Sequence, residues 1–446
     1  MVSEGDTIFA VASGRGRAGI AVVRVSGPAA GLVLRQLGGC GLPPARRATL
    51  VRLRDGDGET IDRGLVLWFP APASVTGEDV AEFHVHGGTA VSAAVLKALA
   101  STGGLRAAEP GEFTRRALLH GKLDLTQAEA VADVVAAETE AQRRQALRQL
   151  EGDLGRLYED WRQRVLKLMA HLEAAIDFAD EDVPAGLEDE VRRDAVALAD
   201  ALDGHLADSG RGERVREGLS VAIVGAPNAG KSSLLNALAR REAAIVSPQP
   251  GTTRDIIDVA LDIGGYPVVL SDTAGIRRDG DGIEIEGMRR ARAAAARADL
   301  KLVVVDGARW PGIDEETRTL IDDDSIVVVS KADLIEATGA VGGVGRCRAE
   351  VTSTLTGQGL SELAGRIGAE IEKRWGLREA PALTRVRHRL GLVACRDALR
   401  RLNDAAAVET AAEELRSAAA ALGRITGRID VEEMLGAVFR DFCIGK

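Results

Sequence analysis

Residues 225–232 read Gly-Ala-Pro-Asn-Ala-Gly-Lys-Ser, a glycine-rich stretch whose spacing suits the binding of phosphates. This G-x-x-x-x-G-K-S pattern follows an apolar run at 219–224 and precedes a helix predicted at 233–239. Glycines let backbone amides face phosphate oxygens, and a helix N-terminus favours negative charge. We expect Lys231 to reach the β- and γ-phosphates and the Ser232 hydroxyl to ligate Mg²⁺. The predicted nucleotide contacts here are Asn228, Ala229, Gly230, Lys231, Ser232 and Ser233.

Further motifs follow in the order that a GTP site requires. A Thr-Thr pair at 252–253 can sense the γ-phosphate and its metal ion. The D-T-A-G run at 272–275 ends a predicted strand, so its aspartate can hold the metal through water. Ser-Lys-Ala-Asp at 330–333 resembles N-K-x-D, whose aspartate pairs with guanine, and Ser-Thr at 353–354 resembles the element that contacts guanine O6. Together they predict a GTPase, with nucleotide contacts at Thr252, Thr253, Asp272, Thr273, Ala274, Gly275, Ser330, Lys331, Asp333, Ser353 and Thr354.

Two residues depart from the GTPase pattern. Ser330 stands where the pattern has Asn, so we expect one base contact and one tether to the phosphate loop to be weakened or changed. Thr354 stands where Ala is usual. Because Asp333 carries most of the guanine discrimination, GTP remains the expected nucleotide.

Water activation needs a group other than the glutamine that follows D-T-A-G in small switch GTPases, because Ile276 stands there. Asn228 can offer its amide oxygen to a monovalent cation beside the phosphates, where an arginine finger acts in other GTPases. Glu284 can orient or deprotonate the water. Its alternative role is that of a solvated carboxylate in the loop after D-T-A-G.

The remaining sequence predicts an α/β plus all-α fold. The N-terminal segment carries strand patterns at 20–25, 65–69 and 82–86 and a helix at 90–100. Strands and helices alternate around the phosphate motif, which predicts an inserted doubly wound P-loop domain with a parallel sheet. Helical sequence lies on both sides of it and can pack as one domain. The expected segments are the N-terminal α/β domain at 1–117, helical residues 118–215, the GTPase domain at 216–372 and helical residues 373–446.

The first helical segment contains residues that typically start or interrupt a helix. Thr126 to Glu129 has the spacing of a capping box, and apolar residues then recur at helical intervals to about residue 180. Gly152 and Gly155 are expected to bend or break this helix.

Composition limits the class of protein. The net charge of −10 over 446 residues argues against general nucleic-acid coating. A stretch at 385–401 nevertheless holds six arginines, which is either a nucleic-acid contact or a solvated helix surface. Four cysteines without C-x-x-C spacing favour a reducing cytosol, and no signal peptide or apolar membrane span is visible, so we expect a cytoplasmic protein.

The motifs and their order resemble the tRNA-modifying GTPase family MnmE, also called TrmE. The resemblance covers essentially the whole chain. It rests on G-R-G-x-x-G-I at 14–20, R-V-S-G at 24–27, T-G-E-D-V at 76–80, H-G-G at 86–88, P-G-E-F-T at 110–114, G-K-L-D-L-T-Q-A-E-A at 121–130, I-D-F at 176–178 and F-C-I-G-K at 442–446.

The resemblance implies a folate-binding, dimerising N-terminal domain and a homodimer. It implies a heterotetrameric complex with the flavoprotein MnmG (GidA), and potassium-dependent GTP hydrolysis with Mg²⁺. Together the two proteins would install a (carboxymethyl)aminomethyl group at C5 of the wobble uridine of certain tRNAs. The one-carbon unit would come from 5-formyl- or 5,10-methylene-tetrahydrofolate. The alternative is a regulatory GTPase switch for ribosome or complex assembly, which would need neither the N-terminal motifs nor the terminal cysteine.

Site residues transfer from the family by position. Glu284 and Lys231 are the implied catalytic residues for hydrolysis. Cys443 lies in a tail that is a poor prenylation signal, so we expect no membrane anchor, and its thiolate could attack uridine C6 or carry the one-carbon unit. The implied potassium ligands are Asn228, Ser247, Gln249 and Thr252, the magnesium ligands Ser232 and Thr253, and the folate contacts Arg24, Glu82, Lys122 and Lys446.

Overall fold

The structure is a computed structural model that describes part of the chain in two compact units. The described residues are 5–14, 16–39, 41–177, 186–208, 210–245, 257–272, 293, 295–335, 343–344, 348–378, 380–429, 438–439 and 442–445. The first unit comprises Met1–Ala132, Gln149–Asp200 and Gly391–Lys446, and the second comprises Asp133–Arg148 and Ala201–Leu390. The four segment boundaries drawn from the sequence remain predictions.

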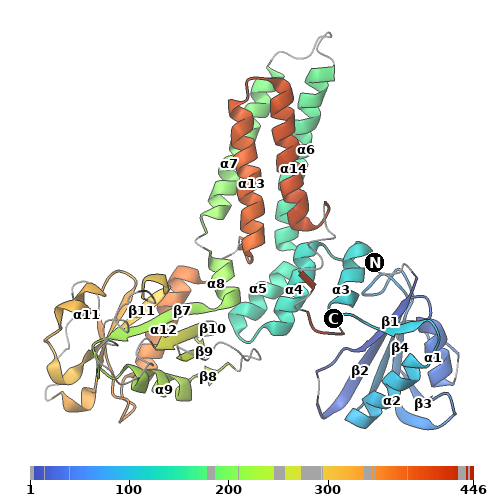
Figure 1. Cartoon of the computed structure of the whole chain (residues 1–446), viewed down its shortest axis with the longest axis horizontal. Helices are drawn as coiled ribbons and strands as arrows, with labels where there is room; N and C mark the ends of the chain where they lie inside the picture. Colours follow the sequence, from blue (N-terminus) through green and yellow to red (C-terminus); the bar gives the residue numbers. More distant parts are fainter. Residues whose placement is uncertain are drawn as a thin grey trace, which may run out of the picture. The chain divides into compact units, whose positions relative to one another are not determined.

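The first unit begins with a six-stranded sheet in the order β3-β4-β5-β2-β1-β6 (Figure 1). Neighbouring strands are antiparallel except β1 and β6. Helices α1 (Ala30–Gly38) and α2 (Thr89–Ala100) pack on one face, where Val23, Phe83 and Leu99 are fully buried. The strands are β1 (Thr7–Val11), β2 (Ala18–Ser26), β3 (Thr49–Arg54), β4 (Thr60–Phe69), β5 (Val80–Gly87) and β6 (Leu105–Ala107).

The opposite face of this sheet carries exposed apolar side chains. Leu50 and Leu65 are direct cross-strand partners, and they alternate with Val51 and Val66, which are buried under α1 and α2. Because successive side chains of a strand point to opposite faces, the two leucines face away from the helices. They are 55% and 41% exposed.

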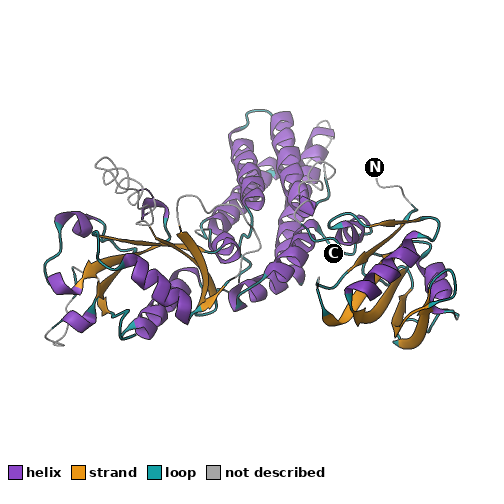
Figure 2. Cartoon of the chain, turned by 60° about the horizontal axis from the view of Figure 1, so that its bottom comes forward, coloured by secondary structure: helices purple, strands orange, loops and turns teal. Residues whose placement is uncertain are grey.

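Helices α6, α7, α13 and α14 lie side by side as a bundle (Figures 1 and 2). The predicted break at Gly152 is confirmed: Gly152 has a φ of +90° and lies between the end of α5 and the start of α6. Gly155 does not interrupt α6. The helices outside the nucleotide-binding sheet are α3 (Glu112–Leu119), α4 (Leu125–Ala136), α5 (Glu140–Leu150), α6 (Asp153–Asp177), α7 (Leu187–Leu206), α8 (Arg211–Glu217), α13 (Val386–Asp404) and α14 (Val408–Thr426).

The predicted capping box at Thr126 is wrong by two residues. Helix α4 begins at Leu125, and the Asp124 carboxylate accepts from the Gln127 amide at 2.9 Å while the Gln127 side chain accepts from the Asp124 amide at 3.0 Å. Aspartate caps helices as well as threonine does, so the reciprocal pair forms two residues earlier than the Thr-x-x-Glu spacing suggested.

The second unit contains a seven-stranded sheet in the order β13-β12-β11-β7-β10-β9-β8. Strands β13, β12, β11, β7 and β10 are parallel, as predicted, but β9 runs antiparallel to β10, which corrects the expectation of an all-parallel sheet. Its strands are β7 (Leu219–Gly225), β8 (Ala243–Ala244), β9 (Ile257–Ile263), β10 (Tyr266–Asp272), β11 (Leu300–Asp306), β12 (Ser325–Ser330) and β13 (Ala349–Val351).

Helices α9 (Lys231–Arg241) and α12 (Leu360–Trp375) cover one face of this sheet through Leu234, Leu238 and Ile367. The other face packs Val303 against Ala295. Strand ends of β7, β10, β11 and β12 therefore meet at one edge, where an α/β sheet binds its ligand. Among the described residues, no helix is long and apolar enough to cross a membrane.

Candidate nucleotide site and N-terminal charged cluster

The turn between β7 and α9 holds the backbone of a phosphate loop. Gly225 and Gly230 have φ of +141° and +95°, and a Cβ on Gly225 would lie 2.2 Å from the Val304 carbonyl oxygen. Only glycine meets both demands. Asn228 also adopts a positive φ, of +62°, and it is exposed at the top of the loop. The loop therefore turns directly into the N-terminus of α9, where backbone amides and the helix dipole favour an anion.

Lys231 lies within this loop. Its side chain is 7% exposed, and Nζ donates to the carbonyls of Gly225 and Ala226, each at 2.8 Å. Burial lowers the pKa of the ammonium, and the nearby charge of Asp272 partly opposes that shift. A buried positive charge is thus fixed where phosphate oxygens would lie.

Ser232 and Asp272 form the adjacent metal corner. The Ser232 hydroxyl, on the first turn of α9, donates to Oδ2 of Asp272, which ends β10 and is 2% exposed. A hydroxyl and a carboxylate are the hard oxygen donors that Mg²⁺ prefers. These two residues fit a magnesium ion held directly by the hydroxyl and through water by the carboxylate.

The base-recognition motifs come together at the ends of β12 and β13. The Ser353 hydroxyl donates to Oδ1 of Asp333, which fixes the carboxylate. Lys331 adopts a positive φ of +53° and donates to Oδ2 of Asp306 at 2.6 Å and to the Asn228 carbonyl at 3.0 Å. The Asp333 carboxylate is exposed, so its remaining acceptor capacity can meet the N–H groups of a base.

Ser330 forms a hydrogen bond to the phosphate loop, although the GTPase pattern has asparagine at this position. Its hydroxyl donates to the Ala229 carbonyl of the phosphate loop at 2.6 Å, and the Val305 carbonyl lies at 3.2 Å. The tether to the loop is thus formed by a serine hydroxyl where the GTPase pattern has an asparagine amide, which agrees with the expectation of a changed tether.

A charged cluster lies on the N-terminal sheet at two of the predicted folate contacts. Arg24 on β2 and Glu82 on β5 are direct partners, with the Arg24 guanidinium 2.9 and 3.0 Å from one Glu82 oxygen. His84 Nε2 is 3.1 Å from the other oxygen, and the Arg24 guanidinium lies 5.8 Å from the ring centre of Phe113. The carboxylate can accept from pterin N–H groups and the cation can meet a carboxylate.

The C-terminal tail docks beside this cluster. The Cys443 carbonyl accepts from the Gly111 amide at 3.4 Å, and Ile444 pairs with Pro110. Gly111 precedes the α3 residues that carry Phe113, so Cys443 and Arg24 reach the same end of α3 from opposite ends of the sequence. Cys443 is exposed, as is Lys122 just beyond α3.

Comparison with known proteins gives the family. A model described as the MnmE helical domain matches residues 125–443, and one described as the GTP-binding protein TrmE N-terminus matches residues 7–122. The tRNA modification GTPase MnmE of Rhodospirillum rubrum is 56% identical over 454 residues, covering 99% of both chains. The chain belongs to the MnmE family. Two further relatives are the MnmE of Paramagnetospirillum magneticum (54% over 444 residues; 99% of this chain, 100% of that one) and the mitochondrial tRNA 5-taurinomethyluridine synthase subunit GTPB3 of Danio rerio (48% over 467; 99% and 93%).

Several residues that the MnmE resemblance assigns lie outside the described part of the chain. Those assigned to hydrolysis and metals are Glu284, Ser247, Gln249, Thr252 and Thr253, those of the D-T-A-G motif are Thr273, Ala274 and Gly275, and the terminal folate contact is Lys446. Thr354 is described and exposed, and it follows the buried Ser353.

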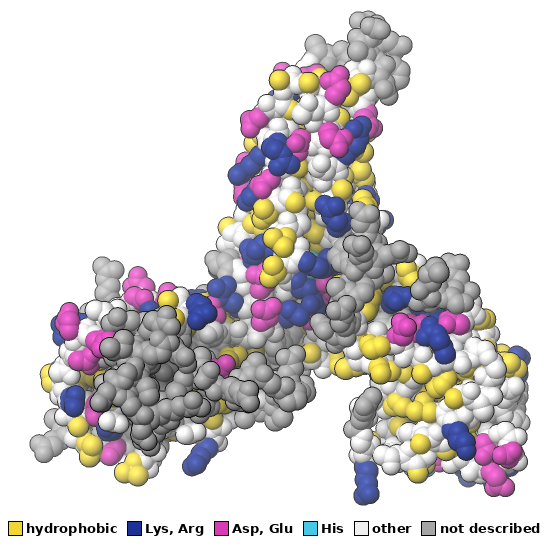
Figure 3. All heavy atoms as spheres, viewed as in Figure 1, with side chains coloured by type: hydrophobic (Ala, Val, Ile, Leu, Met, Phe, Trp, Pro, Cys, Tyr) yellow, Lys and Arg dark blue, Asp and Glu magenta, His cyan; other side chains and the backbone are white. Residues whose placement is uncertain are grey.

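The arginines at 385–401 are largely compensated by acids in this MnmE chain. Arg385 lies 2.8 Å from Asp133, and Arg389 lies 3.1 Å from Glu213. Arg396 and Arg401 pair with Asp397 and Glu414 at 2.6 and 2.7 Å. Acidic and basic side chains are interspersed over the helices (Figure 3). The structure therefore favours the solvated, paired helix surface over a tRNA contact formed by all six arginines.

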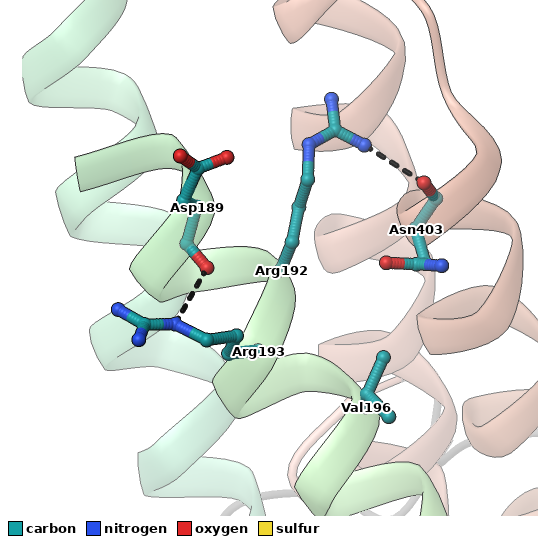
Figure 4. A pocket seen from close by; sticks show the side chains of 5 residues that line it. All are labelled: Asp189, Arg192, Arg193, Val196 and Asn403. Atoms are coloured by element: carbon teal, nitrogen blue, oxygen red, sulfur yellow. Dashed lines mark hydrogen bonds between the residues drawn. The ribbon is translucent and has the colours of Figure 1, made fainter. Parts of the chain in front are cut away.

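A groove of about 470 Å³ lies between α7 and the end of α13, and its lining includes residues that hold these helices together. It is lined by Asp189, Arg192, Arg193, Val196 and Asn403 (Figure 4). Arg192 donates to the backbone carbonyls of residues 402, 403 and 405 at 2.9–3.0 Å, at the C-terminal end of α13. Terminal carbonyls of a helix need such partners, so Arg192 fastens α7 to α13.

Two neighbours of the predicted site residues were not predicted as part of either site. Asp306 holds Lys331, and His84 is hydrogen-bonded to Glu82. Burial alone would raise the pKa of Asp306, but the hydrogen bonds from Lys331 and the Ala308 amide, together with the charges of Lys331 and Arg309, outweigh it and lower that pKa. An acid directly after the apolar strand residues 302–305 was the available signal for Asp306, because strand ends line the ligand edge of such a sheet.

Proposed function

We propose that this chain is a potassium- and magnesium-dependent GTP hydrolase that works with the flavoprotein MnmG (GidA) on tRNA. The pair installs a (carboxymethyl)aminomethyl group at C5 of the wobble uridine, using a one-carbon unit from a tetrahydrofolate derivative. Family membership and the convergence of Lys231, Ser232 and Asp333 at one sheet edge support the GTPase part. The observation that favours modification over a simple assembly switch is that Cys443 docks on Gly111, two residues before Phe113, whose ring lies under the guanidinium of Arg24 in the Arg24–Glu82 pair, because a switch needs no such cluster.

In this proposal the Lys231 ammonium stabilises the charge that develops on the β- and γ-phosphates. Ser232 and Asp272 hold the magnesium ion, which neutralises the same oxygens when bound. Asp333, fixed by Ser353, reads the guanine N–H groups. Glu284 orients or deprotonates the attacking water.

Potassium should be required for fast hydrolysis, with Asn228 among its ligands. The exposed amide of Asn228 at the top of the loop supports this role, since a cation there would act where an arginine finger acts. Replacing K⁺ by Na⁺ should lower kcat about 10³-fold while nucleotide binding is retained, since an arginine finger is worth at least that much. Asn228→Ala should lose the stimulation. Equal rates of phosphate release in the two salts would contradict the potassium site.

A reduced folate should bind at the Arg24–Glu82 cluster and stabilise the chain. At a hundredfold excess over Kd the gain is about 2.7 kcal/mol, which calorimetry of the whole chain detects as a rise in Tm. Glu82→Gln should remove the rise, because the amide cannot accept two pterin N–H groups as the carboxylate does. Glu59→Gln, an exposed change in the β3–β4 turn, serves as the matched control. A rise that persists in Glu82→Gln would place folate elsewhere.

The terminal tail should be needed for modification and not for hydrolysis. Deleting residues 443–446 removes the thiol and the Ile444 contact, yet all described nucleotide contacts lie in the second unit. Mass analysis of wobble uridines should show loss of the modification in cells that carry only the truncated chain, whereas GTPase activity stays normal. Cys443→Ser then separates the thiol from the docking contact. Retained modification in the truncated chain would favour the assembly switch.

Homodimer formation is supported by exposed apolar side chains on the outer face of the N-terminal sheet. Leu50 and Leu65 expose more of their surface than a core-facing strand position does, and Ile20 on β2 is 62% exposed. Exposed apolar side chains that gather on one face commonly mark a protein interface.

A further inference from the structure

Ser330 ends β12 in a pocket of hydrogen-bond acceptors. It is 3% exposed, and its hydroxyl faces the carbonyl oxygens of Ala229 at 2.6 Å and Val305 at 3.2 Å. A serine hydroxyl has a single proton to donate. The shorter distance assigns that proton to Ala229, which belongs to the phosphate loop.

Because this proton is used by the Ala229 carbonyl, the Ser330 hydroxyl cannot also donate to a bound guanine. Guanine N7 is an acceptor and needs a donor. An asparagine amide has two N–H groups and can donate to a loop carbonyl and to N7 at the same time. A serine hydroxyl can donate to only one of them. A buried carbonyl left unpaired keeps the full penalty of its desolvation, so the proton stays with the carbonyl of Ala229, a residue that is 1% exposed.

Other donors in the base motifs are engaged in part. Lys331 Nζ is bonded to Asp306 and to the Asn228 carbonyl, and the Ser353 hydroxyl donates to Asp333. The third N–H of Lys331 and the exposed Thr354 hydroxyl keep donor capacity, so the inference concerns Ser330 itself and not the whole site.

We propose that Ser330 supports the phosphate loop but does not donate to guanine N7, a contact that an asparagine at this position could make in addition. The inference rests on the proposed GTP function. It assigns Ser330 a specificity-determining role: with serine here, the affinity for a guanine nucleotide does not depend on a bond from residue 330 to N7, whereas an asparagine would favour a nucleotide that keeps N7 over one that lacks it.

The test compares GDP with 7-deaza-GDP, in which a C–H group replaces N7, by equilibrium titration of the full chain. The ratio of the two affinities in the wild-type chain is the reference. Ser330→Asn should bind GDP about 2- to 10-fold more tightly, the gain of one net hydrogen bond, and leave 7-deaza-GDP unchanged. Ser330→Ala, which loses the loop tether, should weaken both nucleotides by the same factor.

The outcomes separate the inference from the proposed function. A Ser330→Ala chain that loses affinity for GDP but not for 7-deaza-GDP would overturn the role of Ser330, because its hydroxyl would then contact N7. Binding of neither nucleotide would instead reject the GTP site itself. If Ser330→Asn fails to fold, as circular dichroism would show, Ser330→Ala still decides.

Discussion

Lys231→Ala should lower kcat/KM for GTP by about 10²- to 10³-fold, the loss that follows removal of one preorganised donor to developing charge. The ammonium is 7% exposed and held by two loop carbonyls, so it does not have to be desolvated or reoriented when the phosphates arrive. Charge interactions at such a buried position are stronger than in water. Steady-state phosphate release measures the effect. Lys231→Arg should be nearly as poor, because a planar guanidinium does not fit a position shaped for a point charge.

Lys301→Ala provides a matched control for the loss of a buried lysine. Lys301 is 8% exposed on β11 of the same sheet, but it pairs with Asp322. Its loss should reduce stability and leave kcat/KM unchanged at temperatures where the chain is folded. A Lys231→Ala chain that kept kcat/KM within threefold of the wild type would remove Lys231 from the mechanism.

The nucleotide site could be predicted from sequence because its motifs are local. Each is a short run whose residues are placed by one strand end and one turn, as at Gly225–Lys231 or Ser330–Asp333. The parallel order of β12, β11, β7 and β10 then brings those ends to one edge without further information.

Other features depended on contacts that no short run contains. The tail docks on Pro110 and Gly111 because Phe439 and Phe442 pack with Leu125 and Ala128, an association of segments more than 300 residues apart. Only the family resemblance had pointed to it. The bond from Ser330 to Ala229 likewise joins two motifs whose distance depends on the finished sheet.

Strand β9 was missed for a different reason. Its sequence, Ile-Asp-Val-Ala-Leu-Asp-Ile, places apolar and polar residues in near alternation, whereas the strands expected for a parallel sheet are continuous apolar runs. An antiparallel strand near the sheet edge has a less buried face and shows the alternating pattern. The strand was therefore missed because only the pattern of buried parallel strands was sought, although the alternating pattern of β9 is visible in the sequence.

Asp333→Asn should exchange guanine for xanthine as the preferred base. The Ser353 hydroxyl fixes one carboxylate oxygen of Asp333, and the exposed carboxylate can accept from guanine N1–H and the exocyclic amine. An asparagine amide presents a donor to one of these groups, so GTP affinity should fall by about 10²- to 10³-fold, within the range for losing one partner of a charge-assisted pair. Xanthine carries a carbonyl at C2 and can accept from that amide. Competition of GTP and XTP against a fluorescent nucleotide measures the switch.

Asp314→Asn is the control for loss of an aspartate in the same domain. Asp314 caps α11 (Glu315–Thr319) by accepting from the Thr317 amide at 2.7 Å, and asparagine can replace it in that role. This variant should keep the wild-type preference for GTP. If Asp333→Asn bound GTP and XTP as the wild type does, another group would have to read the base. If ATP competed with GTP for the wild-type chain on equal terms, the site would not be selective for guanine, and Asp333 would have no discriminating role to lose.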